Sequence, residues 1–110
     1  AVWIRRYPMF TPIDDANYEA TLQGCEAGVA LFYKKLCPHC KNMEKVLEKF
    51  ASLAAGVSLF SMDIEENPAA AQVFDAQRAP TILVIKNGKV SGKKAGLMNP
   101  KEMLAFYKAN

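Results

Sequence analysis

Cys37 and Cys40 are separated by Pro38 and His39, and this Cys-Pro-His-Cys sequence is the pattern in the chain best suited to chemistry. Two thiols at this spacing can form and release a disulfide, and the thiolate is the attacking form. Pro38 lacks an amide hydrogen and suits the first position of a helix. Cys37 would then lie at the helix N-terminus, where free amides and the helix dipole stabilise a thiolate. The pattern predicts that Cys37 attacks a disulfide and that Cys40, one turn further on and more buried, resolves the product.

His39 is the only histidine in the sequence, and it lies between the two cysteines. A charged imidazole, or one that donates a hydrogen bond to the Cys37 sulfur, would lower the pKa of that thiol. An exposed first-turn histidine without a chemical role is the alternative interpretation. We predict that Pro38 and His39 tune the Cys37 thiolate.

Paired cysteines also occur in zinc sites and in covalent haem sites, and the sequence disfavours both. A structural zinc site needs four ligands, and the whole chain has three cysteines and one histidine. His39 lies inside the Cys37–Cys40 pair, so it cannot easily join the same tetrahedron. Haem attachment needs a histidine directly after the second cysteine, where this chain has Lys41. We expect no metal and no bound cofactor.

The third cysteine, Cys25, lies apart from the pair. A strand over residues 28–34 would separate it from Cys37 by about 20 Å at ~3.3 Å per residue, too far for a disulfide. We interpret Cys25 as an incidental thiol, with regulatory modification as the alternative.

Length and composition bound the remaining possibilities. A chain of 110 residues is expected to form one domain over residues 1–110, with its own core. No apolar run approaches the ~18 residues that span a membrane. Arg5 and Arg6 interrupt the only stretch that resembles a secretory signal. We expect a cytoplasmic monomer, or a periplasmic protein if a signal was removed before residue 1.

The net charge of +3 is too small, and the basic residues too scattered, for a nucleic-acid-binding surface. We therefore expect neither nucleic acid nor a membrane as a partner.

Turn residues divide the chain into alternating strand and helix patterns. The expected order is β-α-β-α-β-α-β-β-α, which predicts the α/β class and a central mixed sheet flanked by helices. Strands are expected over residues 2–9, 29–33, 57–64, 81–86 and 89–94. Helices are expected from residue 11 to about 24, from the cysteine pair to residue 56, over residues 68–74, and from residue 99 onward.

Local signals support several of these boundaries. Thr11-Pro12-x-Asp14 and Asn99-Pro100-x-Glu102 each combine a capping residue, a proline and an acid at a helix start. Asn67 is expected to cap the short third helix, and Asn87-Gly88 predicts a hairpin turn. After Cys40, apolar residues recur at three- and four-residue steps, which predicts a helix that buries Met43, Leu47, Phe50 and Ala54.

Several short motifs occur together in the order and at the spacings of the thioredoxin family, which the chain resembles over nearly its whole length. The resemblance implies a thioredoxin fold and a thiol–disulfide oxidoreductase that reduces protein disulfides. It also implies recycling by a thioredoxin-reductase-type flavoprotein. The motifs are the strand 29–33, Asp63-x-x-x-Asn67-Pro68, Ala79-Pro80-Thr81, Lys86-Asn87-Gly88 and Lys94-Ala95-Gly96.

The resemblance also assigns a substrate-binding segment. Pro80 corresponds to the cis-proline of the family, whose loop faces the cysteine pair, and cis X–Pro bonds are uncommon elsewhere. The backbone of Ala79 and Thr81 would then pair with an extended substrate segment, like an added strand.

The cysteine motif departs from that of most thioredoxins, which carry Cys-Gly-Pro-Cys. Cys-Pro-His-Cys resembles periplasmic disulfide-forming oxidases, but these contain an inserted helical domain for which 110 residues leave no room. The chain resembles the atypical thioredoxin type called desulfothioredoxin, which has the same Cys-Pro-His-Cys centre. Leu36 replaces the common tryptophan before the first cysteine, and Lys45 replaces the proline that kinks the following helix.

A second departure concerns proton transfer. The buried aspartate that helps to deprotonate the resolving cysteine in the family corresponds to Leu31, and its lysine partner corresponds to Ser61. Three other carboxylates are candidates for proton transfer to Cys40, although surface positions are expected for all of them: Glu44, Asp63 and Glu65.

These features favour a dithiol that donates electrons to protein disulfides. The same chemistry in reverse, as a disulfide donor or isomerase in an oxidising compartment, is the first alternative. A redox-inert module that binds peptides in the groove at Pro80 is the second, and the intact cysteine pair argues against it.

Overall fold

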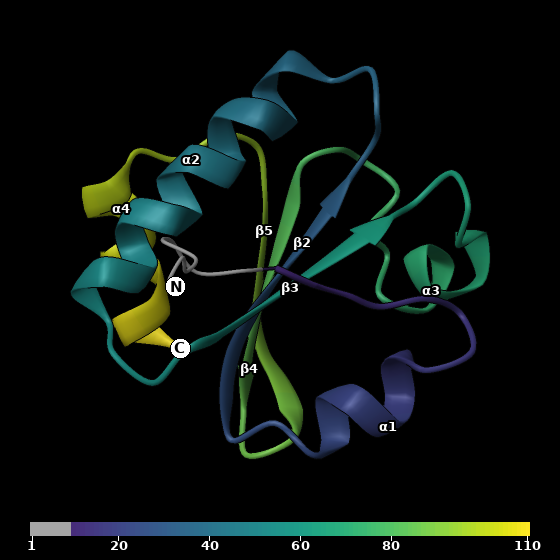
Figure 1. Ribbon diagram of the computed structural model, residues 1–110, viewed down its shortest axis with the longest axis horizontal. Helices are drawn as coiled ribbons and strands as arrows, with labels where there is room; N and C mark the ends of the chain where they lie inside the picture. Colours follow the sequence, from purple (N-terminus) through teal and green to yellow (C-terminus); the bar gives the residue numbers. More distant parts are fainter. Residues whose placement is uncertain (1–9) are drawn as a thin grey trace, which may run out of the picture.

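The structure is a computed structural model that describes residues 10–110, with a central sheet between two groups of helices (Figure 1). The element order agrees with the predicted one, and the α/β class and mixed sheet are confirmed. The elements are β1 (Thr11–Pro12), α1 (Tyr18–Gln23), β2 (Ala27–Tyr33), α2 (Pro38–Leu53), β3 (Ser58–Asp63), α3 (Pro68–Val73), β4 (Thr81–Lys86), β5 (Lys89–Ala95) and α4 (Pro100–Ala109).

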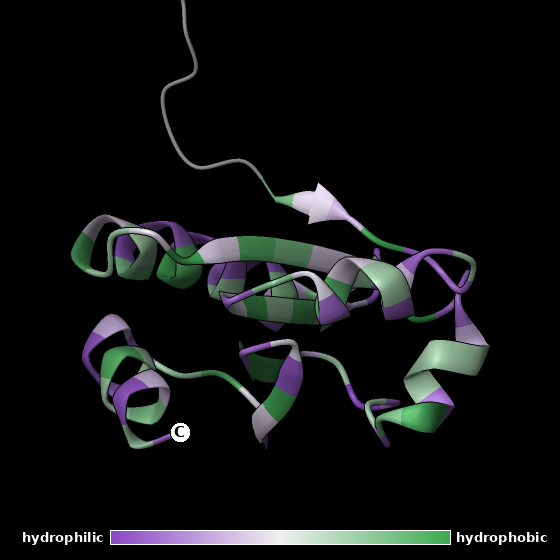
Figure 2. Cartoon of the chain, turned by 90° about the horizontal axis from the view of Figure 1, so that it is seen from below, coloured by the Kyte–Doolittle hydropathy of each residue, from purple (hydrophilic) through white to green (hydrophobic). Residues whose placement is uncertain are grey.

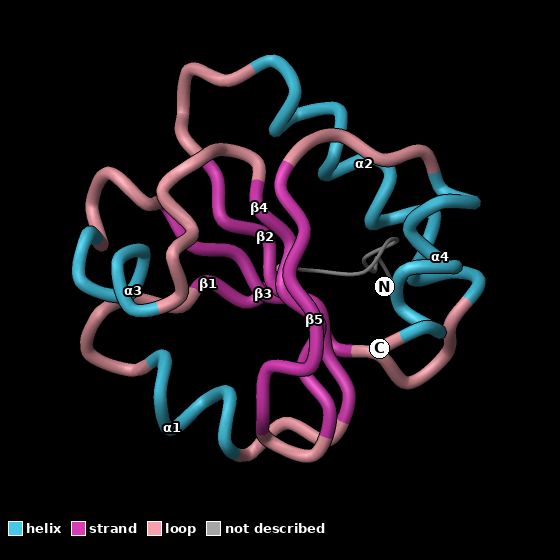
Figure 3. Tube along the Cα trace, turned by 180° about the vertical axis from the view of Figure 1, so that it is seen from behind, coloured by secondary structure: helices cyan, strands magenta, loops and turns pink. Residues whose placement is uncertain are grey.

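The strands follow the order β1-β3-β2-β4-β5 across the sheet. β1, β3 and β2 are parallel, whereas β4 is antiparallel to β2 and to β5. In Figure 3 the strands form the magenta centre of the molecule, with cyan helices to either side. Because β2 and β4 run in opposite directions, the end of β2 lies beside the beginning of β4. We call this side of the sheet, which is formed by strand ends and not by an outermost strand, the sheet edge. Phe32 pairs there with Thr81.

Alternate residues of β2 enter two separate cores, as expected for a strand buried on both faces. Ala30 and Phe32 pack towards α1 and α3, whereas Val29 and Leu31 pack towards α2 and α4. All four side chains are fully buried. Figure 2 shows hydrophobic residues, in green, along the strands between the helices. The sheet is therefore packed against helices on both faces, and its strand ends are a rigid support for the loops that follow β2 and precede β4.

The long helix α2 buries the face that its sequence predicts. Met43, Leu47 and Phe50 have no exposed surface, while Ala54 is half-buried at the end of the helix. Phe50 packs edge-to-face on Tyr107 of α4, with 5.2 Å between the ring centroids. α2 is thus anchored along its length, and its N-terminus projects towards the sheet edge at which β2 ends.

Two local predictions are confirmed at the C-terminal end. Asn87 and Gly88 both have positive φ, as the two-residue turn between β4 and β5 requires. Asn99 and Glu102 form a reciprocal capping box at the start of α4. No helix within residues 10–110 is long and apolar enough to span a membrane.

The N-terminal segment differs from the prediction in where its first helix begins. The strand expected over residues 2–9 lies outside the described residues. The helix expected from residue 11 begins at Tyr18 instead, because Thr11 and Pro12 pair with β3 as a short strand. The amide of Ile13 continues this pairing by donating to Ser61 O at 2.9 Å. Sheet pairing therefore overrides the local helix-start signal.

The cap of α3 is also different from the prediction. Asn67 occupies the N-cap position but makes no capping hydrogen bond with its side chain. The carboxylate of Asp15 accepts instead from the amides of Ala69 and Ala70, at 3.3 and 2.8 Å. The Asn67 side chain accepts from the Asp15 amide at 2.9 Å. Asn67 thus holds the residue that caps the helix.

Asp15→Ala should lower the free energy of unfolding by about 1 kcal/mol, a typical cost for losing a helix cap. The cost arises because two amides of α3 lose their acceptor. Urea denaturation measures the change, with Glu48→Ala as the control, since the Glu48 side chain makes no hydrogen bond or ion pair within residues 10–110. An equal loss in both variants would contradict this role of Asp15.

Candidate active site

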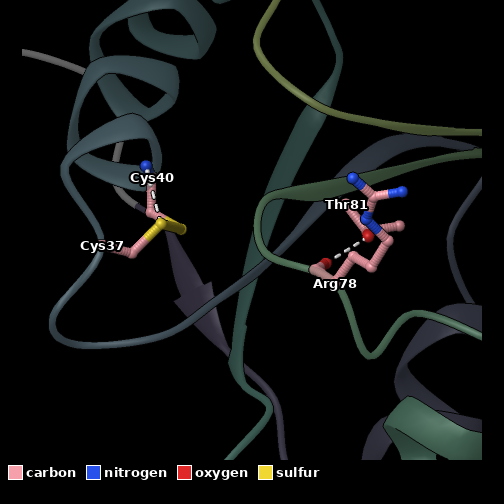
Figure 4. The surroundings of a disulfide bond; sticks show 4 residues. All are labelled: Cys37, Cys40, Arg78 and Thr81. Atoms are coloured by element: carbon pink, nitrogen blue, oxygen red, sulfur yellow. Dashed lines mark hydrogen bonds between the residues drawn. A yellow bond between two sulfur atoms is a disulfide. The ribbon is translucent and has the colours of Figure 1, made fainter.

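Cys37 and Cys40 form a disulfide at the N-terminus of α2, with their Cα atoms 5.2 Å apart (Figure 4). Cys37 is the N-cap residue and has an extended backbone, while Pro38 occupies the first turn of the helix. The side chain of Cys37 accepts a hydrogen bond from the Cys40 amide, with 3.2 Å between nitrogen and sulfur. The cysteine pair therefore lies where the sequence places it, at the positive end of a helix.

The two cysteines differ in accessibility. Cys37 is half-buried, whereas Cys40 is only 1% exposed. A thiolate at Cys37 would keep the Cys40 amide as a donor, and hydrogen bonding to the charged form lowers a pKa. A sulfur that meets solvent and has an amide donor is suited to attack. The covered sulfur beside it is suited to the second, intramolecular step.

The residues that flank Cys37 are open to solvent. Pro38 and His39 are exposed on the first turn of α2. Leu36, which precedes the motif, is 97% exposed. An apolar side chain left in water beside a reactive sulfur offers contact area to an incoming protein.

The loop before β4 lies at the same sheet edge, because Thr81 pairs with Phe32 near the end of β2. The Ala79–Pro80 peptide bond is cis. Pro80 is buried, Ala79 is half-buried, and the carbonyl of Pro80 accepts from the Gly96 amide at 2.8 Å. The Thr81 hydroxyl donates to Arg78 O (Figure 4). This loop and the loop that leads from β2 to the cysteine motif therefore start from neighbouring strand ends.

The prediction that Asp63 is a surface acid is wrong. Its side chain is 7% exposed because it lies at the end of β3, under the loop that leads to α3. Oδ1 accepts from the amides of Glu65 and Glu66, at 2.9 and 3.4 Å. Oδ2 has no hydrogen bond within residues 10–110, and the Lys35 ammonium lies 3.9 Å from it.

The position of the expected family aspartate is fully apolar. Leu31 has no exposed surface and belongs to the core under α2 and α4. It pairs in register with Ser61 on β3, so the two positions that differ from the family are neighbours. Neither residue carries a charge, so no acid–base group lies at these two positions.

Cys25 takes no part in the cysteine pair. It is a free, buried cysteine that belongs to the core under α1 and α3. Burial raises the pKa of its thiol, which makes it less reactive at neutral pH. Within residues 10–110, no group of three or more His, Cys, Asp or Glu side chains could hold a metal ion.

A cavity beside Cys40 was missed by the sequence interpretation. It has a volume of about 160 Å³ and lies between the end of β2 and the first turns of α2. The only signal in the sequence is the i,i+4 spacing of Cys40 and Glu44, which places both on one helix face. The lining residues are Tyr33, Lys34, Lys35, Cys40, Lys41 and Glu44.

The chain is similar to known proteins over most of its length. The thioredoxin family model matches residues 9–109. Thioredoxin of Haemophilus influenzae is 34% identical over 97 residues, which cover 86% of this chain and 90% of that protein. Thioredoxin of Staphylococcus haemolyticus is 34% identical over 96 residues, with coverage of 84% and 88%.

A solved structure shares the architecture. The solution structure of reduced desulfothioredoxin from Desulfovibrio vulgaris Hildenborough superposes with a TM-score of 0.83 at 38% sequence identity. The match covers 94% of this chain and 99% of that one.

Proposed function

Because this chain belongs to the thioredoxin family and is a thiol–disulfide oxidoreductase acting on protein disulfides, we propose that Cys37 and Cys40 are its redox centre. The observation that carries the proposal is the amide of Cys40 donating to the Cys37 sulfur at the start of α2. This donor stabilises a thiolate at Cys37, which suits Cys37 to attack the substrate. Cys40 is covered and is therefore assigned to the second step, in which it resolves the mixed disulfide.

The reaction proceeds in two exchanges. The Cys37 thiolate attacks one sulfur of a substrate disulfide, whose S–S bond breaks and whose other sulfur leaves as a thiolate. Cys40 then loses its proton and attacks the Cys37 sulfur, which releases the second substrate thiol. Two electrons pass to the substrate, and the chain is left with the Cys37–Cys40 disulfide.

Membership of the family implies disulfide-containing protein substrates and a reductase partner. The finer proposal is a flavoprotein of the thioredoxin-reductase type, which reduces the disulfide so that the chain itself needs no bound cofactor. We further propose that residues 1–110 form a single domain that acts as a monomer. The location proposed for a reductant of this kind is the cytoplasm.

The substrate groove is proposed to include Ala79, Pro80 and Thr81. Support comes from their position at the sheet edge where β2 leads into the cysteine motif. An extended substrate segment that pairs with the backbone of Ala79 and Thr81 would present its disulfide to the exposed side of Cys37. Leu36, which is exposed directly before Cys37, would offer an apolar contact to the same segment.

The direction of electron flow is tested by a redox titration of the Cys37–Cys40 couple against glutathione. A potential close to the roughly −270 mV of thioredoxin would support the reductant, and one close to the roughly −120 mV of the oxidase DsbA would support the disulfide donor. Reduction of insulin disulfides, followed by turbidity, separates both from a redox-inert binding module, which would show no activity.

His39→Gly should raise the pKa of Cys37 and lower the reduction potential of the couple, by roughly 30 mV or more. The reason is that a donor or positive charge beside the sulfur stabilises the reduced form as a thiolate. Thiolate absorbance against pH and the glutathione titration measure the two quantities. His39→Ala removes the imidazole altogether, without the loss of helix propensity that glycine brings, and should act in the same direction. If neither quantity moves in either variant, His39 has no tuning role.

A further inference from the structure

Cys40 presents a chemical problem that the fold itself creates. Its sulfur must lose a proton before it can attack Cys37, yet the residue is only 1% exposed. Burial disfavours the charged form of a thiol. The strand beneath α2 offers no acid, because Leu31 fills that position. A proton acceptor for Cys40 must therefore reach it from another direction.

The cavity beside Cys40 provides such a route. Glu44 follows Cys40 by one helical turn, so both side chains project from one face of α2. Glu44 is half-buried and is the only carboxylate among the residues that line the cavity. A volume of about 160 Å³ is ample for several water molecules, each of which needs only about 10–15 Å³ of such space. The buried thiol and the carboxylate thus share one space that can conduct a proton.

The charged groups around this cavity are mainly basic. Lys35 forms ion pairs with Glu66 at 2.8 Å and with Asp63 at 3.9 Å. Lys34 and Lys41 also line the cavity and make no ion pair within residues 10–110. Positive charge around Cys40 favours its thiolate once the proton has left.

Tyr33 lines both the cavity beside Cys40 and a second cavity, which contains Asp63 and Glu66. Burial, followed by the nearby carboxylates of Asp63 and Glu44, raises the pKa of the Tyr33 phenol. Asp63 and Glu66 therefore line a different cavity from Cys40, although Lys35, which lines the Cys40 cavity, lies 3.9 Å from Asp63.

We propose that Glu44 is the base that accepts the Cys40 proton when the mixed disulfide is resolved, an inference that rests on the proposed function. The proton moves from the Cys40 sulfur to the Glu44 carboxylate, directly or through water in the cavity. The Cys40 thiolate attacks the Cys37 sulfur, the Cys37–substrate bond breaks, and the substrate sulfur leaves with the electron pair. Glu44 then releases the proton to the departing thiolate or to solvent.

The two exchanges can be timed separately with an aromatic disulfide that releases coloured nitrothiobenzoate. The reduced protein is mixed with this reagent in a stopped-flow instrument. Attack by Cys37 releases one nitrothiobenzoate at a rate proportional to reagent concentration. Resolution by Cys40 releases the second at a rate independent of that concentration. The rates are recorded from about pH 5 to about pH 9, which spans the ordinary pKa values of carboxyl and thiol groups.

Glu44→Gln should slow the second release about tenfold or more near neutral pH, the lower part of the range for general base catalysis. The difference should shrink towards pH 9, because hydroxide in the solvent removes the Cys40 proton more readily as the pH rises, and the carboxylate is then needed less. The first release should keep its rate. Glu44→Asp, which retains a carboxylate, should recover part of the loss. Glu48 lies one turn further along α2 and outside the cavity, so Glu48→Gln should release both nitrothiobenzoates at the wild-type rates.

An unchanged or faster second release in Glu44→Gln would overturn the inference, as would an equal slowing at every pH, which indicates a structural defect. Asp63→Asn provides a further test. If it slows resolution more than Glu44→Gln does, the base is Asp63. Failure of the proposed function is distinguishable with insulin, because the wild type itself would then fail to reduce insulin, whereas failure of the inference alone leaves the wild type active and removes only the effect of Glu44→Gln.

Discussion

Cys40→Ser is expected to convert a transient intermediate into a stable product in which Cys37 is joined to a substrate protein by a disulfide. Without the second thiol, the mixed disulfide can be released only by external thiols, and uncatalysed rearrangement takes minutes to hours. Turnover should therefore be lost almost completely. Gel electrophoresis without reductant would show the complex as a band that disappears on reduction.

Cys37→Ser is the matched variant and should neither trap substrate nor reduce insulin, because the remaining Cys40 is 1% exposed. Cys25→Ala, which removes the other buried thiol, should leave trapping by the Cys40→Ser protein intact. Complexes formed through Cys40 in Cys37→Ser, in a yield comparable with those formed through Cys37, would reverse the assignment of the two roles.

Leu31→Asp should be the most destabilising of the substitutions considered, with a loss of about 3 kcal/mol or more at neutral pH. Leu31 is fully buried, and the substitution would place a carboxylate in the core under α2 and α4. Its register partner Ser61 carries no charge that could compensate. Urea denaturation at several pH values measures the effect.

The pH dependence follows from the burial of the new carboxylate. Burial would raise the folded-state pKa above the ordinary value of about 3.9, so the folded protein would hold the proton more tightly than the unfolded chain. The stability of Leu31→Asp should therefore fall as the pH rises from about 4. Leu31→Asn, polar but uncharged, should lose stability without this additional slope. Parallel pH profiles for the two variants would contradict a buried charge at this position.

Short-range patterns were sufficient for much of the fold. The strand pattern before Cys37 and the three- and four-residue spacing after Cys40 correctly indicated β2 and α2, because each reflects burial of one repeating set of side chains. The turn at Asn87-Gly88 and the capping box of Asn99 were also correct, since both depend on residues close together in the chain.

The errors arose where distant segments compete with local signals. Thr11 and Pro12 form a strand because they pair with β3, which lies about fifty residues further along the chain. The cap of α3 comes from Asp15, at a sequence separation of 55 residues from the Ala70 amide. A local propensity is worth only a few tenths to about one kcal/mol, so a single tertiary contact can reverse it.

By itself, the sequence determined the cysteine pair, the helix that begins there and the family to which the chain belongs, because neighbouring residues encode all three. Only the tertiary structure decided which carboxylate shares a cavity with Cys40. The sequence named both Asp63 and Glu44 as candidate acids, yet the two residues line different cavities. Whether a side chain shares a space with Cys40 depends on how β2, β3 and α2 pack together, and no spacing along the chain specifies that arrangement.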